Sequence, residues 1–372
     1  MVSSTYAVQF LKKALEFYTP SRQESGLANL LVEKASRELG FEHVYTDDIG
    51  NVIATKGDGK PKILLCGHMD TVPGQIPVRI SNGFIYGRGA SDAKSSLVAM
   101  LLAASMVPRE YGTVTFAGVV DEEGNATGIR NLIRGKIDAH YAIFGEPSGI
   151  GSITIAYNGR LALKINCDVG NSAHASAPSL AKNSIEEMFD IWESIKSNID
   201  NISSNNGKKG VSYCLTEFTG GSSHNVTPAK STMTIDVRIP THMTTADVFE
   251  ILDEIIKNMA TKKDIKISYT LEDRTEPFEA DHTSPLVRSL VLGVIDVRGK
   301  RPMLIKKTGT GDMNVLGNVF NIPVVTYGPG DPHSSHTVDE KISIEEYLSS
   351  IEIFKRTIFH LSRLHNKHIS KQ

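Results

Sequence analysis

Residues 63–70 read Ile-Leu-Leu-Cys-Gly-His-Met-Asp, an apolar run that leads into a glycine, a histidine and an aspartate. Such a short apolar run is typical of a strand that is buried on both faces of a parallel sheet. Similar runs at residues 113–120 and 142–144 also lead into acidic residues, and residues 95–106 have the pattern of a helix. This alternation predicts an α/β domain whose mainly parallel sheet is covered by helices.

Residues 159–280 have a different rhythm, in which the elements follow the order β-α-β-β-α-β. We expect them at residues 161–169, 184–197, 211–219, 231–239, 245–259 and 265–271. That order is the ferredoxin-like pattern. The α/β rhythm then returns, with strands at 303–305 and 323–327 and a last helix at 343–365. The sequence therefore predicts a catalytic domain of residues 1–158 and 281–372, interrupted by a smaller inserted domain of residues 159–280.

Length and composition narrow the class of protein. With 372 residues the chain exceeds what one core usually sustains, and its net charge of −2 gives no electrostatic reason to expect nucleic acid or an anionic membrane. No apolar run reaches the roughly 18 residues of a membrane span, and the first residues do not have the pattern of a signal peptide. The cysteines, Cys66, Cys167 and Cys214, are far apart and form no CxxC pair. We therefore expect a cytoplasmic enzyme without nucleic-acid or membrane partners.

Acidic residues and histidines lie where the predicted strands end. They are His68 and Asp70 after the first strand, Asp92 before the helix, Glu122 and Glu123 after residues 113–120, Glu146 after residues 142–144, and His336 after residues 323–327. Taken alone, each has an ordinary explanation, such as a structural His-Asp pair, a helix N-cap, a solvated acidic loop or a surface histidine. Because open α/β sheets bind ligands at the carboxyl ends of their strands, these residues can instead meet in one crevice. Asp70 can then accept the second ring N–H of a metal-binding His68.

Together these residues have the composition of a two-metal site. Two divalent cations bring a charge of +4, which Asp92, Glu123, Glu146 and one hydroxide would neutralise. Nitrogen and oxygen ligands without a thiolate favour Zn²⁺, with Co²⁺ or Mn²⁺ as substitutes. Such a pair of ions polarises a carbonyl and generates hydroxide near neutral pH. Glu122, which the charge balance does not require, can serve as the general base.

Several motifs, taken in order, resemble those of a known family. They are Gly-His-Met-Asp-Thr-Val-Pro at 67–73, Gly-Arg-Gly-Ala-Ser-Asp-Ala-Lys at 87–94, Asp-Glu-Glu-Gly at 121–124 and Gly-Glu-Pro-Ser at 145–148. Over nearly the whole chain, the sequence is similar to the dinuclear zinc peptidase family of acetylornithine deacetylase and succinyl-diaminopimelate desuccinylase. The resemblance implies that one metal is held by His68, Asp92 and Glu146, and the other by Asp92, Glu123 and His336. It also implies that Asp70 orients His68 and that Glu122 is the base. His333 is a rival to His336, and the Thr-x-Asp-Glu sequence after His336 favours the latter.

The same resemblance implies roles for the inserted domain, which would be a lid and dimerisation domain of a homodimer. His174, in Gly-Asn-Ser-Ala-His-Ala-Ser-Ala-Pro at 170–178, would stabilise the oxyanion, often across a dimer interface. Asn225 and Arg238 match positions that bind substrate, and a guanidinium suits a carboxylate. The alternative for Arg238 is a structural ion pair with Asp236. Gly309, Thr310 and Gly311 resemble a glycine-rich substrate loop.

Within the family, Gly-Glu-Pro-Ser-Gly at 145–149, Tyr-Asn-Gly-Arg at 157–160 and Tyr-Gly-Pro-Gly-Asp at 327–331 look most like one branch. That branch releases lysine or ornithine from the γ-glutamyl C-terminus of an amino-group carrier protein, LysW, in lysine and arginine biosynthesis. Pro332–Ser335 depart from the branch pattern. The alternatives with the same metals are deacetylation of N-acetylornithine and cleavage of peptides as a dipeptidase or carboxypeptidase. A non-catalytic binding protein would need a broken ligand set, and every ligand position here carries a competent residue.

Overall fold

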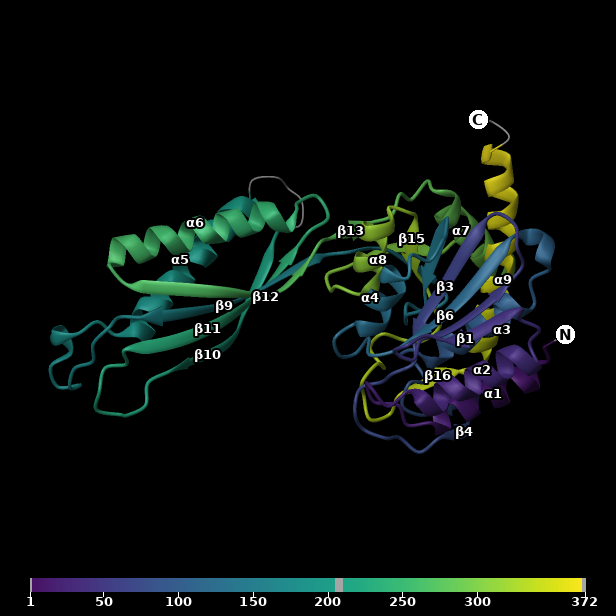
Figure 1. Cartoon of the computed structure of the whole chain (residues 1–372), viewed down its shortest axis with the longest axis horizontal. Coiled ribbons are helices and arrows are strands. Elements are labelled where there is room, and N and C mark those ends of the chain that lie inside the picture. The colour runs from purple at the N-terminus through teal and green to yellow at the C-terminus, as the bar shows by residue number, and fades with distance from the viewer. Residues whose placement is uncertain (1, 205–209, 370–372) are drawn as a thin grey trace. The chain divides into compact units, whose positions relative to one another are not determined.

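The computed structural model of the chain describes residues 2–204 and 210–369 and divides into two compact units (Figure 1). Unit 1 comprises Met1–Ala156, Ala280–Lys306 and Val315–Gln372, and unit 2 comprises Tyr157–Glu279 and Lys307–Asn314. The sequence had placed residues 307–314 with the catalytic domain. In the structure the Asn158 N–H donates to the Lys307 carbonyl at 3.1 Å, which attaches this short segment to unit 2.

A mixed sheet with a parallel centre forms the core of unit 1, as the sequence predicted. Its strands follow the order β1-β2-β6-β3-β7-β15-β8, and β14 pairs with β8. They are β1 (His43–Thr46), β2 (Val52–Lys56), β3 (Lys62–His68), β6 (Thr113–Val119), β7 (Tyr141–Phe144), β8 (Ser152–Tyr157), β14 (Met303–Lys307) and β15 (Val324–Thr326). The neighbours β6, β3, β7 and β15 are parallel, whereas β1 with β2, β2 with β6, and β8 with β15 are antiparallel.

The helices of unit 1 pack on this sheet or on one another (Figure 1). They are α1 (Ser4–Glu16), α2 (Ser25–Arg37), α3 (Lys94–Ser105), α4 (Thr127–Arg134), α7 (Pro285–Arg298), α8 (Asp312–Phe320) and α9 (Ile344–Ile369), with the short 3₁₀ turn η1 (Arg109–Tyr111). Helix α3 is buried on every side, and α1 and α9 contact it. Its sequence is accordingly apolar all round rather than amphipathic, as a central helix requires.

A second, small sheet of unit 1 has the order β16-β5-β4 and consists of β4 (Arg79–Ser81), β5 (Phe84–Tyr86) and β16 (Lys341–Ser343). Strand β16 pairs antiparallel with β5, with Lys341 opposite Tyr86. The chain then runs from β5 through residues 87–93 into α3, so this sheet anchors one end of the loop that carries Asp92.

Unit 2 has the predicted β-α-β-β-α-β order. Its elements are β9 (Gly159–Asp168), the 3₁₀ turn η2 (Pro178–Leu180), α5 (Ser184–Ser204), β10 (Ser212–Gly220), β11 (Lys230–Ile239), α6 (Thr245–Lys263), β12 (Lys266–Thr275) and β13 (Phe278–Glu279). The sheet order is β10-β11-β9-β12, and every neighbouring pair is antiparallel. This confirms the ferredoxin-like pattern.

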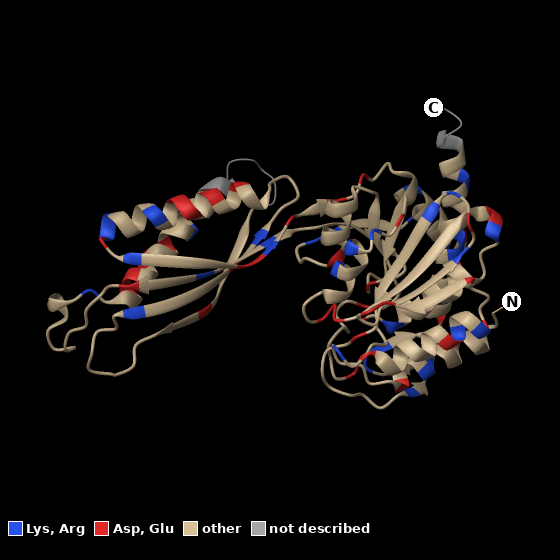
Figure 2. Ribbon diagram, in the orientation of Figure 1, with Lys and Arg blue, Asp and Glu red and all other residues tan. Residues whose placement is uncertain are grey.

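The core of unit 2 lies between its sheet and the two helices. Alternate residues of β9 and β11, such as Leu163 and Ile235, face α5 and α6 and are fully buried. Helix α6 begins with a capping box between Thr244 and Asp247 and ends in a basic turn (Figure 2), which suits the partial charges of a helix dipole. Among the helices of the described residues, none is long and apolar enough to cross a membrane.

Candidate active site

The acidic loops of unit 1 emerge from one edge of its sheet. Strands β3, β6, β7 and β15 are parallel neighbours, so the loops that follow them meet at their carboxyl ends. His68 is the last residue of β3, Glu122 and Glu123 follow β6, Glu146 follows β7, and His336 lies in the loop after β15. The structure thus brings the predicted acidic residues and histidines of unit 1 together.

Two glycines let α3 approach this edge closely. A Cβ on Gly67 would lie 2.8 Å from the Met100 methyl carbon, and a Cβ on Gly145 would lie 2.3 Å from the same atom. Each glycine immediately precedes a site residue, His68 or Glu146. A larger side chain at either position would push the strand end away from α3 and displace the residue that follows.

Asp92 lies between the two histidines. Its Oδ1 is 3.3 Å from His68 Nε2, and its Oδ2 is 3.3 Å from His336 Nε2. Glu146 Oε1 is 3.7 Å from His68 Nε2, and Glu123 Oε1 is 2.9 Å from His336 Nε2. Each histidine therefore faces one oxygen of Asp92 and one further carboxylate, an arrangement that suits a carboxylate shared by two cations.

The ring of His68 is oriented as a ligand. It is fully buried, and its Nδ1 lies 2.8 Å from the Asp70 carbonyl oxygen, which can only accept. In the neutral ring Nδ1 therefore carries the proton, and Nε2 presents a lone pair. Within the described residues Nε2 has no hydrogen-bond partner, although two carboxylates face it. The carboxylates that face Nε2 need a positive charge there: burial disfavours a second ring proton, but Glu146, Asp70 and Asp92 outweigh it and raise the pKa of His68 well above its ordinary value. A divalent metal ion would meet the same need, and the donor set fits one.

Several carboxylates lie close together in the site, and this crowding of negative charge shifts the pKa values of its groups. Burial raises the pKa of Glu122 to about 7, and burial followed by the charge of Asp92 raises that of Glu123. Burial would also raise the pKa of Asp92, but its contacts with His336 and His68 hold it well below the usual value. The hydrogen bond to Asp92 raises the pKa of His336 to about 9. Without metal, these carboxylates can share the site only by recruiting protons.

Asp70 contacts more than His68. We expected its carboxylate to accept the second ring N–H of His68, but the nearer acceptor is its carbonyl oxygen, and the carboxylate Oδ1 lies 3.6 Å from Nδ1. The carboxylate instead accepts the backbone N–H groups of Glu122 and Glu123, both at 3.0 Å, and the Ser21 hydroxyl at 2.7 Å. Asp70 therefore orients His68 through its main chain and the Glu122-Glu123 pair through its side chain.

Glu122 lies beside the ligand-type groups. Carboxylate and ring atoms of His68, Glu122 and Glu146 lie within 4.8 Å of one another, as do those of His68, Asp92 and Glu123. Glu122 is thus within reach of anything bound between these side chains. The ring contacts to Asp92 and Glu123 are made by His336, whereas His333 uses its backbone N–H to bind Asp331.

Unit 2 brings His174 and Asn225 together. Val226 forms an isolated antiparallel bridge with His174, and the Ala175 N–H donates to the Asn225 carbonyl at 2.8 Å. The Ser176 N–H donates to His174 Nδ1 at 3.2 Å, so a neutral ring carries its proton on Nε2. His174 is exposed and presents that N–H as a donor, which is the form that oxyanion stabilisation requires.

Unit 2 also joins Arg238 to the glycine-rich loop. The Arg238 guanidinium contacts Asp236 at 2.6 Å through Nε and at 3.3 Å through Nη2, and its Nη1 donates to the Thr310 hydroxyl at 3.1 Å. The ion pair with Asp236 that the sequence left open is therefore present, together with a contact to the loop. Gly311 donates its N–H to Asn314 at 3.1 Å. A Cβ on Gly309 would meet no atom of the described residues within 4 Å, so its surroundings there are open.

Sequence reasoning missed three residues that contact candidate site residues or their neighbours in unit 1 or in unit 2. Ser21 binds the Asp70 carboxylate, Arg160 binds Asp236 at 2.6 Å, and the buried Glu340 binds the loop of Asp92. Glu340 had entered only as context for His336, and Arg160 only as part of a motif. Each contact joins segments far apart in the chain, and no spacing rule connects them. The sequence contains no local signal for Glu340, because its burial and its partners become apparent only in the structure.

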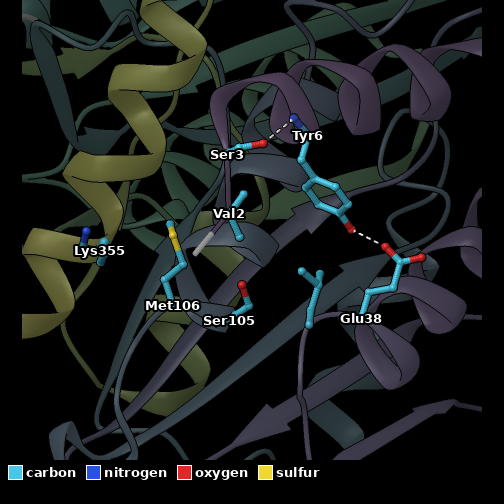
Figure 3. A pocket seen from close by; sticks show the side chains of 8 residues that line it. Val2, Ser3, Tyr6, Glu38, Ser105, Met106 and Lys355 are labelled. Carbon is cyan, nitrogen blue, oxygen red and sulfur yellow. Dashed lines mark hydrogen bonds between the residues drawn. The ribbon is translucent and has the colours of Figure 1, made fainter.

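A separate hollow of about 640 Å³ lies on unit 1 among α1, α9 and the ends of α2 and α3 (Figure 3). The Tyr6 hydroxyl points across it and donates to the Glu38 carboxylate at 2.8 Å. Lys34 binds the same carboxylate at 2.6 Å. Among the described residues, none of those predicted for the site lines this hollow, so it is separate from the acidic cluster.

Known proteins resemble the whole chain. The model of peptidase family M20/M25/M40 matches residues 64–360. A Pyrococcus furiosus protein, provisionally named LysW-lysine/LysW-ornithine hydrolase, is 36% identical over 364 residues, which cover 97% of this chain and 99% of the relative. The Saccharolobus solfataricus LysW-lysine/LysW-ornithine hydrolase is 33% identical over 352 residues, 95% of each chain. The crystal structure of aminopeptidase PepT from Bacillus cereus shares the fold, with a TM-score of 0.81, 22% identity, and coverage of 97% of this chain and 99% of that one.

Proposed function

The chain belongs to peptidase family M20/M25/M40 and is a hydrolase, and we propose that it releases lysine or ornithine from the γ-glutamyl C-terminus of an amino-group carrier protein. Two relatives with LysW-lysine/LysW-ornithine hydrolase names match it over nearly their full lengths. The bond cleaved would be an amide that joins the amino acid's amine to the side-chain carboxyl of a terminal glutamate.

One observation carries the metal-dependent part of this proposal: each oxygen of Asp92 faces a different histidine at 3.3 Å. We assign His68, Asp92 and Glu146 to one cation and Asp92, Glu123 and His336 to the other. Two divalent cations bound there supply Lewis acidity, which polarises a carbonyl and acidifies water. The donor atoms are nitrogen and oxygen, so we propose Zn²⁺ as the resident metal, with Co²⁺ as a competent substitute.

We propose that side chains carry out the proton transfers of the reaction. Glu122 takes a proton from the attacking water and delivers it to the leaving nitrogen as the carbon–nitrogen bond breaks. Asp70 holds Glu122 by its backbone N–H at 3.0 Å, which keeps the base beside the ligands.

Unit 2 would supply the residues that recognise the substrate. We propose that the Nε2–H of His174 stabilises the oxyanion, and that Asn225, Arg238 and the Gly309-Thr310-Gly311 loop bind the substrate. The Arg238 guanidinium would bind the α-carboxylate of the released amino acid. In this proposal unit 2 is the lid and dimerisation domain of a cytoplasmic homodimer, and the substrate is a folded carrier protein.

The test is a comparison of substrates with the metal-loaded enzyme. The carrier protein with a lysine or ornithine amide on its terminal glutamate is compared with N-acetylornithine and with a dipeptide. We expect kcat/KM for the carrier-linked amide to exceed that for both small substrates. Equal or better efficiency with N-acetylornithine would instead support a deacetylase, and a preference for the dipeptide would support a peptidase.

A further inference from the structure

Glu340 occupies a buried position behind the loop that carries Asp92. Its side chain is fully shielded from solvent. One carboxylate oxygen, Oε1, accepts the backbone N–H groups of Gly89 at 3.1 Å, Ser91 at 2.9 Å and Asp92 at 2.9 Å. The other, Oε2, accepts from Arg88 Nη1 at 2.8 Å. A single carboxylate thus binds four of the five residues from 88 to 92.

Glu340 also belongs to the loop that carries His336. It lies four residues after His336 and immediately before β16, and its carbonyl oxygen accepts the Gly87 N–H at 3.2 Å. At the other end of the same loop, the Ser91 hydroxyl donates to the Asp331 carbonyl at 3.0 Å. The His336 loop is therefore fastened at both ends to the Asp92 loop.

His336 needs such a support. It is a non-glycine residue with φ of +63°, a left-handed conformation that costs free energy and persists only when the surroundings hold it. Its side chain is half exposed, so packing around the ring does not fix its position. The hydrogen bonds at Asp331 and Glu340 hold the His336 loop in place instead.

We propose that Glu340 is a positioning residue, which holds Asp92 and His336 in register so that both can bind the same cation. The proposal rests on the metal site proposed above and adds a determinant of its affinity. Charge-assisted hydrogen bonds from three backbone N–H groups to one carboxylate fix the direction in which the Asp92 side chain leaves the main chain. Residues that orient metal ligands in this way typically change metal affinity or activity by about 10- to 100-fold.

A structural role alone makes a different prediction. If Glu340 only fastened two loops, its loss would lower the melting temperature of the metal-free protein and leave metal affinity unchanged. If it positions ligands, zinc affinity falls in protein that is still folded. Metal binding is therefore the deciding readout, and it does not depend on any substrate.

The experiment titrates metal-free wild type, Glu340→Gln and Asp339→Asn with Zn²⁺ in a calorimeter. Asp339 is the exposed neighbour of Glu340, and its substitution removes the same charge without touching the Asp92 loop. We expect wild type and Asp339→Asn to bind two ions alike. Glu340→Gln should bind at least one ion about 10- to 100-fold more weakly. Zinc affinities of Glu340→Gln equal to those of wild type would overturn the proposal.

Folding is followed in parallel by the thermal melt of each metal-free protein. If Glu340→Gln does not melt cooperatively, Glu340→Asp takes its place, because it keeps the charge beside Arg88 but is one methylene shorter. It should also lose about tenfold or more in zinc affinity, and wild-type affinity in this variant would overturn the proposal. Wild-type protein that binds no zinc would instead overturn the proposed function itself, and this inference with it.

Discussion

His68 and His174 differ in the backbone group that lies next to Nδ1. This difference gives the two neutral rings opposite tautomers. The Nδ1 of His68 faces the Asp70 carbonyl, which accepts, so its Nε2 presents a lone pair. The Nδ1 of His174 faces the Ser176 N–H, which donates, so its Nε2 presents a proton. One ring is thereby suited to a cation and the other to a developing anion.

The substitution Glu122→Gln tests whether Glu122 is the general base, and it removes none of the proposed metal ligands. The amide keeps the shape of the side chain and the backbone contact to Asp70 but cannot take a proton. We expect kcat to fall by about 10²–10⁴-fold, since general bases contribute by this amount. Metal content, measured by elemental analysis, should stay at the wild-type value. More than a tenth of the wild-type kcat in the variant would exclude Glu122 as the base.

Strand β11 and its neighbour β9 fix the direction of the Arg238 side chain, which we propose binds substrate. Asp236 and Arg238 lie two apart on β11, and Arg160 is directly opposite Arg238 on β9. Asp236 accepts from Arg238 Nε through Oδ1 and from Arg160 Nε through Oδ2, both at 2.6 Å, and Arg238 Nη2 also lies 3.3 Å from Oδ2. The acid between two guanidiniums limits how the Arg238 side chain can turn, which leaves its Nη1 toward Thr310.

Asp236→Asn is therefore expected to raise KM for the carrier-linked substrate by about tenfold or more, with a smaller change in kcat. The reason is that Arg238 loses its charged partner and its fixed direction, which matters most for binding a carboxylate. Asp273→Asn is the matched control, because Asp273 also binds Arg160 but does not contact Arg238. Steady-state kinetics of both variants decide the matter, and equal KM values in the two would contradict this role.

The elements that the sequence predicted are those whose signal is local. Strands β3, β6 and β7 are short apolar runs, and β9, β11 and α6 have clear periodicity, so each lies within a few residues of its prediction. The small strands β4, β5 and β16 were not predicted, because three residues are too few to show alternation. The pairing of β16 with β5 also joins distant segments of the chain. The same is true of Glu340, whose bonds to the Asp92 loop join residues about 250 positions apart.

One part of the candidate site could also be predicted from the sequence, and another part could not. His68, Asp92, Glu123, Glu146 and His336 could be predicted because strand ends of a parallel sheet converge and the motifs have a fixed order. The division of labour of Asp70, whose carbonyl meets the histidine and whose carboxylate meets the acidic loop, could not. It depends on the direction of one side chain at the end of β3, which the sequence does not encode locally.

Both units of the molecule carry groups with proposed roles. Unit 1 contains the acidic cluster, and unit 2 contains His174. If His174 acts on the site of a partner subunit, mixing two inactive variants restores activity. Heterodimers of His174→Ala with Glu122→Gln would contain one site with both groups intact. We expect each variant alone to lose about 100-fold or more in kcat, and the re-associated mixture to recover up to about a quarter of the wild-type activity.

The controls for that experiment are each variant taken through the same dissociation and re-association alone. Size-exclusion chromatography with light scattering reports the oligomeric state of the wild type. A fully active monomer would contradict the homodimer, and a mixture no more active than its components would contradict action across the interface.

A metal titration decides whether the cluster around Asp92 is a two-metal site on which hydrolysis depends. Metal-free protein is titrated with Zn²⁺ while bound zinc and hydrolysis of the carrier-linked lysine amide are measured in the same samples. A two-metal site predicts no activity in metal-free protein and a plateau at two ions per chain. It also predicts that Asp92→Asn, which removes the shared carboxylate, neither binds two ions nor reaches that plateau. Full activity in the metal-free wild type, or two tightly bound ions in Asp92→Asn, would contradict it.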